Sequence, residues 1–162
     1  MDAHAWHLML NHFPVILSMV GAAAAMIAFL TRRRGVLLYA LVTLTLAGLS
    51  SYPALRSGHA AAELLEDRWY VDDDQIDVHH DSGERTHLIL LATGIISAVA
   101  LWRTLRTVRE AKPGLAVLTV VAVMGIASAA TVSWTSWQGG FIAIKNPTLI
   151  NSTNPPGTPR QP

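Results

Sequence analysis

Histidine and carboxylate residues gather in one short stretch of the chain, Ile76–Leu91, which reads IDVHHDSGERTHLILL. In a helix, residues three, four and seven positions apart share a face, so His80, Glu84 and His87 would point the same way. Glu84 and His87 also have the Glu-x-x-His spacing that carboxylate-bridged dimetal proteins use in helix bundles. The stretch therefore predicts a metal site where the chain enters an apolar helix.

Two other segments repeat this helical spacing of polar groups. His4, His7 and Asn11 share a face near the start of the chain, and His59, Glu63 and Glu66 share one further along. Imidazole and carboxylate ligands without thiolate favour iron, manganese, zinc or copper(II) over copper(I). Because His79 and His80 are adjacent, at most one of them can follow the face of Glu84. The candidate metal ligands are His7, His12, His59, Glu63, His79, His80, Glu84 and His87.

A b-type haem is the competing cofactor, since it requires two neutral imidazoles on opposite sides of a planar macrocycle. His7 or His12 could face His87 across a bundle in which their helices enter from the same side. A structural role is the third reading, because histidines at a membrane interface also bond lipid headgroups or cap helices. The chain has no cysteine, which excludes disulfides, thiolate ligands and c-type haem attachment.

The elements that must position these residues read as membrane helices. The chain has 162 residues, of which 51% are hydrophobic and only 14% charged, against roughly 25% charged in ordinary soluble domains. Four apolar runs are long enough to cross a bilayer, at about 1.5 Å per residue. We predict an all-α fold in one domain, residues 1–150, with spans near 8–30, 36–55, 87–106 and 114–136.

Two segments outside those spans are predicted to have other conformations. Residues 56–86 read as an acidic, histidine-rich loop with a short helix at Ser57–Asp67. Residues 151–162, rich in proline and polar side chains, read as a flexible tail.

The charges predict the orientation of the bundle. Arg32–Arg34 join the first two spans, and four basic residues between Arg103 and Lys112 join the last two, so both connections are expected in the cytoplasm. Both termini and the loop would then lie outside a bacterial inner membrane, together with all seven histidines, and the loop alone holds nine of the eleven acidic residues. A cleaved signal peptide is the less favoured reading of the first span, because its arginines follow the apolar run.

The last span ends in WTSWQGGFIAIKNP. Trp134 and Trp137 lie where an interfacial aromatic belt is expected. Gly139 and Gly140 favour a tight turn just beyond the span, with the floor of a binding site as the alternative.

The segment His7–Leu17, HLMLNHFPVIL, resembles the opening of small bacterial four-span membrane proteins known as domain of unknown function 2231. The resemblance continues at Gly58 with Glu63, at His79 with Glu84, and at the Gly-Gly-x-Ile element that ends at Ile142. It covers most of the chain and implies a four-helix membrane fold. The chain departs from the family pattern at His59, His80 and His87, which implies a cofactor particular to this protein if those histidines are ligands.

These observations lead to one favoured hypothesis and two alternatives. The favoured one is a redox or electron-transfer subunit with a metal or b haem at its outer face, exchanging electrons with a quinone or a basic periplasmic carrier attracted to the acidic loop. The alternatives are a cofactor-free accessory subunit of a larger membrane complex, and a metal-ion carrier or sensor. The lipid bilayer is an expected partner and nucleic acid is not, since the basic residues read as topology signals. No hydrolase motif or phosphate-binding glycine loop is evident.

Overall fold

The fold consists of four long α-helices, and the computed structural model describes residues 3–63, 73–108 and 111–145. The helices are α1 (Ala3–Thr31), α2 (Arg34–Glu63), α3 (Asp73–Arg106) and α4 (Leu115–Lys145), and these described segments contain no strand. Each helix is long and apolar enough to cross a membrane. The prediction of an all-α bundle of four candidate membrane helices is confirmed.

The helices extend further than the predicted spans, mostly at one end of the bundle. Residues 56–63 continue α2 and residues 73–86 begin α3, so most of the predicted loop is helical and Ser57 does not start a separate helix. The predicted turn at Gly139 and Gly140 is also wrong, because α4 runs through both. Hydropathy marks where a lipid-facing surface ends, whereas backbone hydrogen bonding continues through good helix formers such as Ala60–Glu63. Residues 64–72 and the predicted tail at 151–162 lie outside the described segments.

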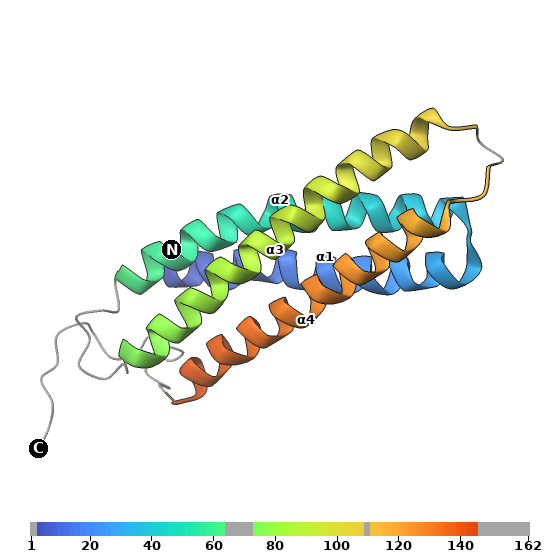
Figure 1. The fold of residues 1–162 in the computed structure, drawn as a ribbon. Helices are drawn as coiled ribbons and strands as arrows, with labels where there is room; N and C mark the ends of the chain where they lie inside the picture. The colour runs from blue at the N-terminus through green and yellow to red at the C-terminus, as the bar shows by residue number, and fades with distance from the viewer. Residues whose placement is uncertain (1–2, 64–72, 109–110, 146–162) are drawn as a thin grey trace, which may run out of the picture.

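The helices form a ring in which α1 and α3 occupy opposite corners. Both α1 and α3 pack against α2 and against α4, and α3 and α4 cross obliquely over the other pair (Figure 1). The starts of α1 and α3 and the ends of α2 and α4 meet at what we call the histidine end, which carries His7, His59, His79, His80 and His87. The opposite arginine end carries Arg32–Arg34 and Arg103.

Many large apolar side chains point outward, while alanines together with a few leucines and valines fill the interior. Leu30 is 72% exposed and Leu49 is 65% exposed, whereas Ala28 is fully buried. This pattern is typical of a protein surrounded by lipid. Lipid tails are as apolar as leucine, so helices there associate by close packing and not by a hydrophobic force. The main core lies in the arginine half of the bundle, around residues Ala24, Ala25, Ala28, Leu37, Ala40, Leu41, Leu44, Leu118 and Val121.

Two glycines allow the backbones of α2 and α3 to touch at their crossing. A Cβ atom added to Gly48 would lie 2.8 Å from the Cα of Gly94, and one added to Gly94 would lie 3.0 Å from the Cα of Gly48. On the other side of the bundle, a Cβ on Gly125 would lie 3.2 Å from the Cα of Ala22. The sequence permits these approaches only because the three positions lack side chains.

One of the arginines read as a topology signal also has a structural role. Arg34, at the start of α2, donates hydrogen bonds to the carbonyl oxygens of Thr104 and Val108 at 2.5 and 3.1 Å. It also donates to the hydroxyl of Thr107 at 3.0 Å. These acceptors include backbone carbonyls that a helix end leaves without intrahelical partners. Arg34 therefore ties the end of α3 to the start of α2.

We predict that Gly48→Ala destabilises the bundle while Gly35→Ala does not. The added methyl group at position 48 would force two backbones apart, and overpacking of this kind costs about 1–3 kcal/mol. Gly35 is the matched control, since a Cβ there meets nothing within 4 Å. The measurement is thermal unfolding in detergent followed by circular dichroism. Equal midpoints for the two variants would contradict the proposed crossing contact.

Candidate functional site

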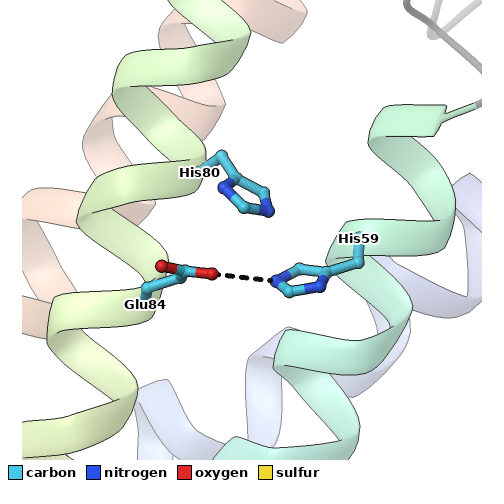
Figure 2. A group of neighbouring side chains, drawn as sticks. All are labelled: His59, His80 and Glu84. Atoms are coloured by element: carbon cyan, nitrogen blue, oxygen red, sulfur yellow. Dashed lines mark ion pairs between the residues drawn. The ribbon is translucent and has the colours of Figure 1, made fainter.

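Three potential metal ligands meet between α2 and α3 at the histidine end. His80 and Glu84 are four residues apart on α3 and so share a face, and His59 reaches toward them from α2 (Figure 2). One ligand atom from each of the three residues lies within 4.8 Å of the others. Helical spacing thus supplies two of the groups, and the packing of α2 beside α3 supplies the third.

The spacing inside this group suits an ion more than a direct contact. Nε2 of His59 lies 3.6 Å from Oε1 of Glu84, which is too long for a hydrogen bond, and that nitrogen has no hydrogen-bond partner among the described residues. Two ligands each about 2.1 Å from a tetrahedral ion lie about 3.4 Å apart. The rings of His59 and His80 have their centroids 4.4 Å apart and are tilted by 36°. Small rotamer changes would therefore bring three ligand atoms around one ion.

A cavity of about 380 Å³ opens beside this group, between the four helices. Apolar residues such as Val15, Leu90 and Val132 line one part of it. Gly139 and Gly140 line it too. Six of the seven histidines contribute to the lining: His7, His12, His59, His79, His80 and His87.

The ring of His87 is oriented by α2. The hydroxyl of Ser51 donates to the carbonyl oxygen of Gly48 at 2.7 Å, which uses its only proton. That hydroxyl must therefore accept the 2.8 Å hydrogen bond from Nδ1 of His87. The neutral ring consequently carries its lone pair on Nε2.

His7 shows the same arrangement one turn further along α2. The hydroxyl of Ser57 donates to the carbonyl oxygen of Ala54 at 2.9 Å. Both of these oxygens lie 3.2 Å from Nδ1 of His7 and accept its proton. The ring packs against Gly58, where an added Cβ would lie 3.1 Å from Cε1 of the imidazole.

His79 occupies the opposite wall of the cavity. Its ring packs on Gly139, where an added Cβ would lie 2.9 Å from its Cε1, and its centroid lies 6.5 Å from that of His7. Nδ1 of His79 is buried with no hydrogen-bond partner in the part of the chain that the structure describes. Burying such a nitrogen without a partner costs about 1–3 kcal/mol, so this wall of the cavity favours a ligand or a bound water.

The predicted ligands thus divide into two sets. His59, His80 and Glu84 form the close group, whereas His87, grouped with Glu84 from the sequence, turns instead to Ser51. His7, His12 and His79 line the cavity outside that group, and Glu63 is exposed at the end of α2 without joining it. Both His79 and His80 line the cavity although they are adjacent. The ring of His79 lies near that of His7, and the ring of His80 lies near that of His59.

The residues that orient the imidazoles were not predicted. Ser51, Ser57 and the carbonyl of Ala54 do so from α2, a helix that the sequence presents only as a membrane span. Serines in an apolar helix are a weak signal, since they also pack helices or bond their own backbone.

Comparison with protein-family models, curated proteins and solved structures gives no match for this chain. The resemblance to domain of unknown function 2231 therefore stays a prediction. Function must be inferred from the chain's own geometry.

We predict that Ser51→Ala lowers the free energy of unfolding more than Ser50→Ala. Removing Ser51 leaves Nδ1 of His87 without its acceptor, at a cost of about 1–3 kcal/mol. Ser50 is the matched control, because within the described part of the chain its hydroxyl bonds just the carbonyl of Ala47 in its own helix. Denaturation of both variants in detergent measures the difference. Equal stabilities would mean that Ser51 does not hold the ring of His87.

Proposed function

We propose that this protein is an integral membrane protein that binds a transition-metal ion at its histidine end and serves in electron transfer. The observation that carries the proposal is the group of His59, His80 and Glu84, with ligand atoms within 4.8 Å of one another. Two imidazoles and a carboxylate suit iron, manganese, zinc or copper(II). A redox role requires iron, manganese or copper, because zinc has no redox chemistry.

The group leaves coordination positions open. Three protein ligands are fewer than the four of a closed structural site, so water or an external ligand would complete the coordination. The carboxylate of Glu84 is the accessible member, with its side chain 52% exposed, whereas His59 is 31% exposed. An ion held here would take one ligand from α2 and two from α3 and would be accessible on the side of Glu84, which suits electron exchange with a carrier.

The same exposure favours a second function, a metal-ion carrier or sensor that loads ions reversibly. A carrier requires a ligand that solvent reaches, and Glu84 satisfies that requirement. Weak, exchangeable binding without a redox wave would favour this function over electron transfer. Protein that binds no metal at all would favour a cofactor-free accessory subunit.

We further propose that the histidine end faces the outside of a bacterial inner membrane. Arg32–Arg34 and Arg103 lie together at the other end, and clustered arginines are retained on the cytoplasmic side. A basic electron carrier or a quinone could then reach the site from the outer face.

The metal proposal predicts that Glu84→Gln weakens metal binding while Glu63→Gln does not. Zinc titrated into metal-free protein in detergent serves as the probe, and loss of a ligand should weaken its binding by at least about tenfold. Glu63 is the matched control, since it lies at the same end outside the ligand group. We expect His80→Ala to match Glu84→Gln. Unchanged zinc affinity in both would reject the proposed ligands.

The orientation proposal predicts opposite labelling of two single-cysteine variants. The natural chain has no cysteine, so Asp74→Cys and Gly35→Cys each provide one thiol without background. Both positions are exposed, at the histidine and arginine ends respectively. In intact spheroplasts a membrane-impermeant maleimide should label only Asp74→Cys, and after lysis it should label both. The reverse pattern would place the metal site in the cytoplasm.

A further inference from the structure

The proposed ligands His59, His80 and Glu84, which we call the ion group, lie on one side of the cavity. Most of the residues that line the cavity have no role in that site. His7 and His87 line the remaining volume from opposite corners of the ring of helices, since they belong to α1 and α3. The volume of about 380 Å³ lies within the range of about 300–1,000 Å³ found for ligand sites. Its combination of apolar walls with a few convergent polar groups is typical of a cofactor site.

Both imidazoles are prepared as metal ligands. Nδ1 of His87 donates to the hydroxyl of Ser51, and Nδ1 of His7 donates to Ala54 and Ser57. Metal-binding histidines almost always donate their second ring nitrogen in this way, which fixes the tautomer and raises the basicity of the ligating nitrogen. In both rings the lone pair is therefore on Nε2.

This part of the cavity offers too few ligand atoms for an ion without a macrocycle. Within the described segments, only His59, His80 and Glu84 bring three ligand atoms close together, whereas a protein-bound ion usually takes three or four ligands from the chain. A haem iron differs, because the macrocycle provides four nitrogens and the protein need only add one imidazole on each side. His7 from α1 and His87 from α3 supply two imidazoles that line the same cavity.

The walls of the cavity leave space for a flat molecule. His7 rests directly on the backbone at Gly58, and Gly83 and Gly140 line the cavity where added Cβ atoms would meet nothing within 4 Å. Deeper in, Leu90 and Val132 present the apolar surface that a macrocycle would cover.

We infer that the cavity is a second cofactor site, separate from the ion group, which binds one b-type haem through Nε2 of His7 and Nε2 of His87. The haem would lie between α1 and α3, with α2 holding both axial ligands through Ser51, Ala54 and Ser57. The inference uses none of the three residues of the ion group.

The test is haem binding by the full chain, expressed with δ-aminolevulinate and titrated with hemin after purification in detergent. We expect one haem per chain, with a Soret band and a sharp α band on reduction that indicate two imidazole ligands. His7→Ala and His87→Ala should each lose the two-imidazole spectrum, and the double variant should lose the haem. Added imidazole should restore the spectrum of His87→Gly, which a merely structural role would not explain.

His12→Ala is the control for this ligand pair. Its side chain is exposed, and its Nδ1 bonds the carbonyl of Leu8 in its own helix. It should keep the full spectrum, and loss of haem in this variant with retention in His87→Ala would overturn the assignment. Wild-type protein that stays colourless with hemin present would overturn the haem site altogether.

Zinc binding distinguishes this inference from the proposed ion site. Variants at His7 and His87 should still bind zinc, which also shows that they are folded. Colourless protein that binds zinc through Glu84 would reject the haem and keep the ion site. If the protein shows a Soret band and Glu84→Gln leaves its zinc affinity unchanged, the ion site is rejected and the haem site stands.

Discussion

The direct contact between the backbones of α2 and α3 at Gly48 and Gly94 is the constraint on which the rest of the structure depends. Lipid provides no hydrophobic force that would drive helices together, so a membrane bundle is stabilised by close packing and interhelical hydrogen bonds. The crossing keeps α2 and α3 in contact at the histidine end. Both the group of His59 with Glu84 and the bond from His87 to Ser51 connect these two helices.

The bundle divides into a packed half and a hollow half. Alanines and leucines such as Ala28 and Leu41 fill the arginine half, where Arg34 ties α2 to the end of α3. The histidine half contains the cavity, bordered by a smaller core of Ala47, Leu90 and Val132. Its walls are joined by polar contacts, including the hydroxyls of Ser82, Thr86 and Thr135 between α3 and α4. A densely packed half therefore adjoins a half that is hollowed by the cavity.

The histidines differ in how the surrounding structure holds them. His7 and His87 donate Nδ1 to α2, so their tautomers are fixed and only Nε2 carries a lone pair. The rings of His59 and His80 have their centroids 4.4 Å apart, and Nε2 of His59 lies 3.6 Å from Oε1 of Glu84 without a hydrogen bond. The histidines at this end of the bundle thus separate into the close group of His59 and His80 with the exposed Glu84, and the oriented imidazoles of His7 and His87 within the cavity.

The sequence by itself determined the four helices and the residues available for chemistry, since hydropathy and helical spacing are properties of neighbours along the chain. It also placed His80 and Glu84 on one face. Only the tertiary structure decided that His59 joins them and that His87 turns to Ser51, because packing between helices sets which faces meet. The contact between the ring of His79 and Gly139 is likewise a product of packing, since it joins α3 to α4.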